Sequence, residues 1–262
     1  MGSTGTVVVK IGGSTLGQHD TTLEDLAELQ RQGVPVVVVH GGGKAISEWQ
    51  RRLQLEPRFV DGLRVTDGES LAIAVAVLSG LVNKELVAGL AALGARAIGL
   101  SGADGALIEA SIKDPRLGYV GSIGRINRHL LDALLDAGYL PLVSPIAIGP
   151  GGQLLNVNAD TVAGEMACAL QARALIFLTD VPGILDEGGI ALGRQHAREM
   201  QALLTRGVVS GGMIPKVKAC VRALEAVQEA HIIDGHTPHA LLECLRGHVR
   251  GTTIVADTTV VH

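Results

Sequence analysis

Strand-like runs alternate with helical patterns along the whole chain, and this alternation restricts the fold more than any other feature. The runs are short and rich in valine, isoleucine and leucine, and they fall at residues 6–11, 34–39, 96–100, 139–145, 174–178 and 231–235. Helical spacing of apolar residues fills most of the intervals between them. Strands joined through helices run parallel, and a parallel sheet needs helices on both of its faces. The chain is therefore predicted to be an α/β protein, a three-layer α/β/α sandwich around a central, mainly parallel sheet.

The length of the chain, 262 residues, suits either one large domain or two smaller ones. No low-complexity linker and no repeat of fixed period divides it. A helical pattern ends near residue 172, and a new strand-like run begins directly after it. We therefore expect two lobes, residues 1–172 and residues 173–262.

The composition argues against two classes of partner. Aromatic residues make up 2% of the chain, too few for the stacking platforms of single-stranded nucleic-acid binders. The 22 basic and 26 acidic residues give a net charge of −4, so no overall basic field attracts DNA or RNA. The longest apolar stretch, residues 71–82, is shorter than the roughly 20 residues that a membrane helix needs. With no secretory leader, the chain is expected to be soluble and cytoplasmic, without nucleic-acid or membrane partners.

Three cysteines, Cys168, Cys220 and Cys244, lie far apart and form no CxxC pair. Their number and spacing argue against a zinc site and against a disulfide framework. Each falls within a helical pattern, so we expect buried thiols. The histidines likewise lack the spacing of a metal-binding helix, and we expect no metal site built from the protein alone.

Glycine-rich turns follow several of the strand-like runs. The run at 34–39 ends in His40 and three glycines, residues 41–43, and without Cβ atoms their N–H groups can approach an anion closely. This turn is neither a P-loop nor a dinucleotide-binding fingerprint. Residues 210–216 join a second glycine turn to a helix start, where the positive end of the dipole attracts anions. Both turns are candidate phosphate sites, although the second one also fits an ordinary turn with a solvated Lys216.

Polar and charged residues near the strand ends complete the candidate site. Lys10 interrupts an apolar run, so it either meets an anion or lies on an edge strand in solvent, because a buried unpaired charge is costly. Arg64 precedes a helix start and is either a surface residue or a bidentate clamp for a carboxylate. Asp160, in the first turn of another helical pattern, either complements the helix dipole or belongs to the site with Asn156 and Lys216.

These groups are nearly all donors or cations, with one central carboxylate and no evident nucleophile. Such a set stabilises negative charge without having to remove a proton. Transfer of a phosphoryl group to an ionised acceptor fits this requirement, because a carboxylate with an ordinary pKa of about 4.3 needs no general base at neutral pH. Catalysis would then depend on positioning and on charge neutralisation.

Seven motifs, taken in order along the chain, resemble those of the acetylglutamate kinases within the amino acid kinase family. They are KIGG (10–13), HGGG (40–43), GLRVTD (62–67), GLVNK (80–84), NVNAD (156–160), TDVPGIL (179–185) and SGGMIPK (210–216). The resemblance covers essentially the whole chain and implies the sandwich fold predicted above. It also implies an ATP-dependent kinase that phosphorylates the side-chain carboxylate of N-acetyl-L-glutamate, giving N-acetyl-L-glutamyl 5-phosphate for arginine synthesis.

The resemblance further implies a role for each candidate residue, with the amino acid in the first lobe and ATP in the second. Lys10 and Lys216 would be catalytic and would stabilise the transferring phosphoryl group, and Asp160 would hold the two lysines in place. The substrate would be bound by Gly42, Gly43, Arg64 and Asn156, and the phosphoryl oxygens would lie near Gly12 and Gly13. The nucleotide would be surrounded by Asp180, Val181, Gly183, Ile184, Leu185, Val208, Val209, Ser210 and Met213. Mg²⁺ would be bound through the nucleotide phosphates rather than in a protein cage.

Two departures from the family pattern bear on the substrate and on assembly. Lys44 follows the three glycines where the family often has proline, and a basic cluster of Arg51, Arg52 and Arg58 lies nearby. The main alternative is therefore a sister kinase of lysine synthesis, which acts on aminoadipate or glutamate attached to a small acidic carrier protein. A catalytically silent sensor of nucleotides or amino acids is a further alternative. The first strand lies close to the start, without the extra helix that joins arginine-inhibited members into hexamers, so we expect an arginine-insensitive homodimer.

Overall fold

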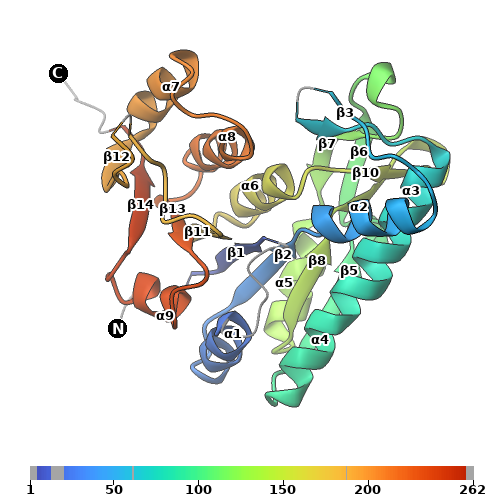
Figure 1. Cartoon of the computed structure of the whole chain (residues 1–262). Helices are drawn as coiled ribbons and strands as arrows, with labels where there is room; N and C mark the ends of the chain where they lie inside the picture. The colour runs from blue at the N-terminus through green and yellow to red at the C-terminus, as the bar shows by residue number, and fades with distance from the viewer. Residues whose placement is uncertain (1–4, 13–20, 61, 187, 258–262) are drawn as a thin grey trace.

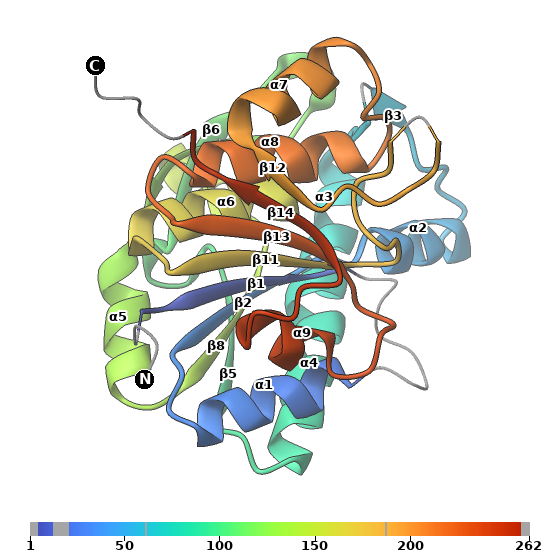
Figure 2. The ribbon, with the colours of Figure 1, turned by 90° about the vertical axis from the view of Figure 1, so that its left-hand side faces the viewer.

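The computed structural model describes residues 5–12, 21–60, 62–186 and 188–257. Its centre is an eight-stranded sheet in the order β12-β14-β13-β11-β1-β2-β8-β5, which fans out as a twisted layer in Figure 2. The strands are β1 (Val7–Ile11), β2 (Val36–His40), β5 (Ala97–Ser101), β8 (Leu140–Ser144), β11 (Ala174–Thr179), β12 (Arg194–His196), β13 (Glu229–Asp234) and β14 (Gly251–Val255). Six of the seven neighbouring pairs are parallel, and only β13 and β14 are antiparallel. The predicted mainly parallel sheet is confirmed.

Helices cover both faces of this sheet, which explains why its central strands β1 and β2 are buried along their whole length and are mostly valine and isoleucine. One face carries α5 (Arg128–Asp136), α6 (Ala159–Leu170), α7 (Ala197–Thr205) and α8 (Met213–Ala223), and the other carries α1 (Thr22–Arg31), α4 (Asn83–Ala92) and α9 (Ala240–Leu245). Side chains alternate between the two faces as the pleat requires: Val8 and Val37 pack under α6, whereas Val7 and Val38 pack on the opposite side. The predicted three-layer α/β/α sandwich is confirmed.

One long helix differs from the expectation drawn from residues 71–82. Gly68–Ala92 is continuous and comprises α3 (Gly68–Val75), a π-helical segment (Ala76–Val82) and α4. By length and apolar composition alone it could cross a membrane, so the expectation that no segment is long enough to do so is wrong for this helix. However, α4 packs against β5, β8 and α1, as the core helix of a folded domain does. No pattern in the sequence predicted the π-helical segment.

A smaller layer lies beyond the carboxyl end of β2. It consists of a four-stranded sheet, β10 (Leu154–Asn156), β9 (Ile146–Ile148), β6 (Ile108–Ile112) and β7 (Gly121–Ile126), and of a short hairpin, β3 (Phe59–Val60) and β4 (Leu63–Arg64). The helix α2 (Gly43–Arg52) and the start of α6 lie between this layer and the central sheet (Figure 1). Three single 3₁₀ turns, Asp104–Ala106, Pro115–Leu117 and Pro150–Gly152, complete the described secondary structure. This arrangement encloses the carboxyl ends of β1 and β2, where polar residues were expected to gather.

Several local expectations need correction. The apolar spacing of Val217, Val221, Leu224 and Val227 predicts one helix over residues 217–229. In the structure, α8 ends at Ala223 and Glu229 already belongs to β13. Val227 matches the apolar spacing of the helix although it lies beyond its end, because it is buried in the connection between α8 and β13. Cys220 and Cys244 are buried as expected, whereas Cys168 is partly exposed. The sheet crosses residue 172 without a break because β11 pairs with β1, so the division into lobes at 172 stays a prediction.

Candidate active site

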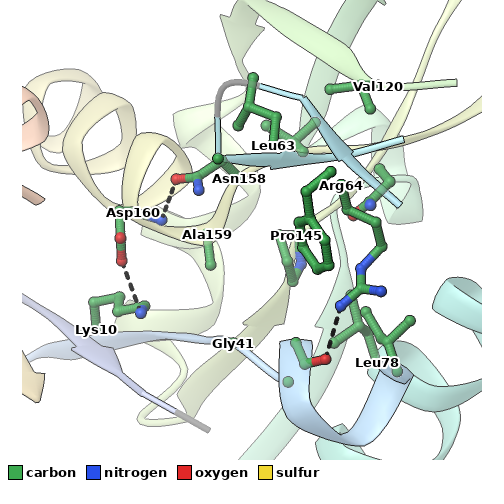
Figure 3. Close-up of a pocket in the computed structure, with 17 residues that line it drawn as sticks. Lys10, Gly41, Leu63, Arg64, Leu78, Val120, Pro145, Asn158, Ala159 and Asp160 are labelled. Carbon is green, nitrogen blue, oxygen red and sulfur yellow. Dashed lines mark hydrogen bonds and ion pairs between the residues drawn. The ribbon is translucent and has the colours of Figure 1, made fainter. Parts of the chain in front are cut away.

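Two lysines converge on one buried carboxylate at the end of β1. Lys10 lies on β1 and places its Nζ 2.7 Å from Oδ1 of Asp160, in the first turn of α6. Lys216, in the first turn of α8, places its Nζ 3.2 Å from Oδ2 of the same carboxylate and donates to the Gly212 carbonyl. Figure 3 shows the pair formed by Lys10 and Asp160 at one side of a cavity. The anion that Lys10 needs within an apolar strand is therefore Asp160.

Burial and the nearby carboxylates have opposite effects on the pKa of Lys10. Removal from water lowers the pKa of Lys10, and the neighbouring positive charge of Lys216 lowers it further. The carboxylates of Asp160 and Asp180 act in the opposite direction and favour the protonated ammonium. One carboxylate between two ammonium groups leaves this cluster with a net positive charge, which suits an anionic ligand.

The glycine turn after β2 is joined to the end of β1 by a backbone hydrogen bond. The N–H of Gly41 donates to the Ile11 carbonyl, and the N–H of Gly12 donates to the Leu178 carbonyl. A Cβ atom on Gly42 would lie 2.5 Å from Cδ2 of Leu78, so a side chain at this position would displace Leu78. Gly42 has no side chain to cap α2, so the first N–H groups of that helix remain available to an anion. Gly13, predicted to lie near the phosphoryl oxygens, falls outside the described residues.

A buried histidine, His40, is hydrogen-bonded to the backbone of this turn. Nε2 of His40 lies 3.1 Å from Nδ2 of Asn83, and Lys84 fixes the Asn83 amide by donating to its Oδ1. Because the Asn83 amide nitrogen can only donate, Nε2 must accept, and the proton then resides on Nδ1. Nδ1 lies 2.9 Å from the Gly41 carbonyl, to which it donates. Burial lowers the pKa of His40 to about 4, so the ring stays neutral at physiological pH.

Acid should therefore destabilise the fold through His40. The pKa of His40 is about 4 in the folded chain against the ordinary 6.5, so between these values the unfolded chain binds a proton that the folded chain does not. Stability is then lost as the pH falls from about 6.5 to about 4, with a contribution of about 2 kcal/mol at about pH 5. Urea unfolding of wild type and His40→Gln at about pH 7 and about pH 5 checks this. We expect the glutamine variant to lose less stability on acidification, and equal losses would contradict the role of His40.

The cavity beside the ion-paired cluster has a volume of about 250 Å³. It lies between the carboxyl ends of β1 and β2, the starts of α2 and α6, and the β3–β4 hairpin (Figure 3). Its described lining comprises Lys10, Gly41, Gly42, Gly43, Ile46, Phe59, Gly62, Leu63, Arg64, Leu78, Val120, Pro145, Asn156, Val157, Asn158, Ala159 and Asp160. Donors and a cation thus lie at both ends, with apolar side chains between them, as a small anionic amino acid derivative would require.

Arg64 and Asn156, both predicted to bind substrate, lie in this lining and are tied to the protein. Nη2 of Arg64 donates to the Gly43 carbonyl at 2.9 Å, the contact drawn in Figure 3. Nδ2 of Asn156 donates to Oγ1 of the buried Thr66 at 3.2 Å. Asn158, two residues further on, caps α6 by accepting from the N–H groups of Asp160 and Thr161 at 3.0 Å each.

The residues predicted to surround the nucleotide lie in two segments beyond the cluster. Ile184 and Val209 are core residues, so only their backbone groups could meet a ligand, and the N–H of Ile184 donates to Oγ1 of Thr252. Asp180 follows β11 and acts electrostatically on Lys10, which links its turn to the cluster. The remaining members are exposed Leu185 and Ser210, partly exposed Val181, Val208 and Met213, and buried Gly183. None of these residues belongs to the described lining of the cavity.

The described residues offer no protein cage for a metal ion. Within residues 5–12, 21–60, 62–186 and 188–257, no three His, Cys, Asp or Glu side chains gather in a suitable arrangement. Asp160 is the acidic residue in the described lining, and lysines engage both of its oxygens. A divalent cation would therefore have to bring its own ligands, as the phosphates of a nucleotide do.

Sequence reasoning missed several lining residues. Val120 and Pro145 come from segments that carry no local signal of binding, and only the fold brings them to the cavity. Asn158 had a detectable signal, because an asparagine directly before a helical pattern is a typical N-cap. Gln50 and Ser47, which contact Arg64, lie on the first helix after the glycine turn and had no signal at all.

Known proteins resemble this chain over nearly its whole length. Residues 5–234 match the amino acid kinase family. The chain is 46% identical to acetylglutamate kinase of Dehalococcoides mccartyi, over 96% of this chain and 94% of that protein, and 48% identical to that of Methanothrix thermoacetophila, over 95% and 91%. A Streptococcus mutans UA159 structure, smu.665, matches with a TM-score of 0.86 at 29% identity, over 97% of this chain and 100% of the other. These matches show that the chain belongs to the amino acid kinase family.

Proposed function

We propose that this chain is an ATP-dependent kinase that phosphorylates the side-chain carboxylate of N-acetyl-L-glutamate. The product would be N-acetyl-L-glutamyl 5-phosphate, an intermediate of arginine synthesis. One observation carries the proposal. Among the described residues that line the cavity, Asp160 is the acidic one, and Lys10 and Lys216 already form ion pairs with it. No free general base is available among the described lining residues, so an acceptor that is already ionised is favoured. Relatives that are 44–48% identical carry the name acetylglutamate kinase, which supports this acceptor.

The two lysines are proposed to supply the electrostatic stabilisation. An oxygen of the acceptor carboxylate would attack the γ-phosphorus of ATP, forming a P–O bond while the bond from that phosphorus to the β–γ bridging oxygen breaks and ADP leaves. Negative charge then spreads over the transferring oxygens, where Lys10 and Lys216 and the N–H groups of the glycine turn would stabilise it. Asp160 would hold both ammonium groups in place and would accept no proton from the substrate.

The other end of the acceptor is proposed to bind at Arg64 and Asn156. Arg64 would receive the α-carboxylate and Asn156 the acetamide group, while Gly42 and Gly43 would bind near the reacting carboxylate. This orientation is supported by the cavity, which has Arg64 at one end and the lysine cluster at the other. Holding both ends of the acceptor fixes the attacking oxygen, which is the main source of rate in such a transfer.

ATP is proposed to bind along the second lobe, residues 173–262, with the base and ribose near the turns at 180–185 and 208–213. The electrostatic link between Asp180 and Lys10 supports a phosphate chain that runs from these turns toward the cluster. Mg²⁺ is proposed to bind to the nucleotide phosphates, where it would neutralise part of their charge. A carrier-bound acceptor or a silent sensor is not favoured, since the relatives of 44–48% identity are named acetylglutamate kinase.

The proposal is tested by incubating the protein with ATP, Mg²⁺ and free N-acetyl-L-glutamate. Hydroxylamine traps an acyl phosphate as a hydroxamate, and ADP is measured in the same samples. We expect hydroxamate and ADP in equal amounts. ADP without hydroxamate, or ATP binding with no product, would refute the proposed acceptor.

We also propose that the kinase is a cytoplasmic homodimer. Support comes from the edge of the sheet, where β5 is the last strand among the described residues. Exposed apolar side chains, those of Leu81, Leu93 and Tyr139, occur on elements near this strand. A pair of copies would cover these groups. Light scattering during size-exclusion chromatography should give twice the mass of the 27.1 kDa chain, and a monomer or a hexamer would contradict the proposal.

A further inference from the structure

Arg64 is held by a buried side chain that the site described above does not include. Gln50 lies on α2 and is 1% exposed. Its Oε1 accepts a hydrogen bond from Nη1 of Arg64 at 2.5 Å, and its Nε2 donates to Oγ of Ser70 at 3.0 Å. Because a guanidinium can only donate, Arg64 dictates which way the Gln50 amide points. A single side chain therefore connects the helix after the glycine turn, the start of α3 and the arginine.

The other contacts of Arg64 come from the same helix and from its own hairpin. Nη2 donates to the Gly43 carbonyl at 2.9 Å and to Oγ of Ser47 at 2.8 Å. The Phe59 ring lies over the guanidinium, with 4.8 Å between Cζ and the ring centroid. Three of the five N–H donors of the guanidinium are thus used by the protein, and the part of the chain that the structure describes gives no hydrogen-bond partner for the other two. The direction of the guanidinium is set before any ligand arrives.

All of these partners are neutral. Arg64 contacts an amide, a carbonyl, a hydroxyl and an aromatic ring, and no carboxylate contacts it among the described residues. Burial and the nearby positive charge of Arg51 both lower the pKa of Arg64, so its charge is placed at some energetic cost. An acidic partner would relieve that cost but would also cancel the attraction for an anionic ligand. The neutral amide of Gln50 provides the contact without the cancellation.

We infer that Gln50 is a positioning residue for the acceptor: its neutral amide fixes Arg64 in direction and leaves the full guanidinium charge for the α-carboxylate. The inference rests on the proposed function, since it names how that site selects its acceptor. Two substitutions test separately the hydrogen bond that fixes the direction of Arg64 and the neutrality of the Gln50 amide. Gln50→Met removes the hydrogen bond at similar volume, whereas Gln50→Glu keeps a bond to Arg64 and neutralises its charge.

The primary readout is the Kd of N-acetyl-L-glutamate by calorimetry, accompanied by kcat and KM for both substrates. We expect Gln50→Met to weaken acceptor binding about fivefold to tenfold, because the ligand itself must then order the Arg64 side chain. Gln50→Glu should weaken binding more, because the added carboxylate competes with the ligand for the guanidinium. The kcat and the KM for ATP should stay within about twofold. The matched control is Gln54→Met, an exposed glutamine just after the same helix, which should change nothing.

A second acceptor distinguishes positioning from a general loss of packing. N-acetyl-4-aminobutyrate has the acetamide and the reacting carboxylate but lacks the α-carboxylate, so its kcat/KM should hardly respond to either substitution at Gln50. An equal loss for both acceptors, or an unchanged Kd for N-acetyl-L-glutamate, would overturn the inference. If the wild type binds N-acetyl-L-glutamate without phosphorylating it, the proposed function fails while the Kd comparison still decides the role of Gln50. Absence of binding to the wild type would overturn both.

Discussion

Replacing Lys216 by alanine should lower kcat by about two to three orders of magnitude, the usual effect of removing one group that stabilises charge in a transition state. Lys216 places its ammonium 3.2 Å from Asp160 and lies outside the described lining of the acceptor cavity. Its proposed contact is with the transferring phosphoryl group, which carries its developing charge only during the reaction. The KM for N-acetyl-L-glutamate should therefore stay within about threefold. Steady-state kinetics with the hydroxamate assay measure both parameters.

The same helix provides a matched control for this experiment. Lys218 lies two residues further along α8 and is exposed, so Lys218→Ala removes an equal charge at a similar place in the fold. Turnover of this variant should remain that of the wild type. Wild-type turnover in Lys216→Ala, or an equal fall in both variants, would remove Lys216 from the proposed mechanism.

The sequence predicted those parts of the molecule that local patterns determine. Val-rich runs separated by helical spacing led to the parallel sheet, because each run must be buried on both faces. Lys10 was informative because a charge in such a run demands a partner. The structure provides that partner in Asp160, which is 150 positions away in the chain.

What the sequence did not predict depends on contacts between distant segments. The antiparallel strand β14 begins Gly-Thr-Thr and reads as weakly as a loop, and only its pairing with β13 makes it a strand. Gln50 reads as a surface residue of an amphipathic helix, but the β3–β4 hairpin and α3 fold over it and bury its amide. Polar groups buried by a neighbouring element cannot be recognised from their own segment. The network that holds Arg64 is therefore visible only in the structure.

Replacing Asp160 by asparagine should destabilise the fold by about 3–5 kcal/mol, because the change leaves a buried lysine without its counter-charge. Lys10 is 6% exposed, and its ammonium lies 2.7 Å from Oδ1 of Asp160. In the asparagine variant, the charge of Lys216 would also act on Lys10 without a carboxylate between them. Urea unfolding near neutral pH measures the loss, and kcat should fall by at least about two orders of magnitude because both lysines lose their common anchor. Asp132→Asn, which breaks a partly exposed ion pair with Arg128 on α5, is the matched control and should cost less than about 1 kcal/mol.

A second substitution separates charge from packing in this variant. Lys10→Met, added to Asp160→Asn, removes the uncompensated charge while keeping an unbranched side chain in the strand. The double variant should regain most of the lost stability, since a buried ion pair can be replaced by apolar groups at little net cost. Its turnover should stay low, because the lysine that neutralises the transferring group is gone. A double variant no more stable than Asp160→Asn alone would mean that the carboxylate stabilises the fold through packing or through Lys216. Recovery of stability without activity would show that the buried lysine is maintained for catalysis rather than for folding.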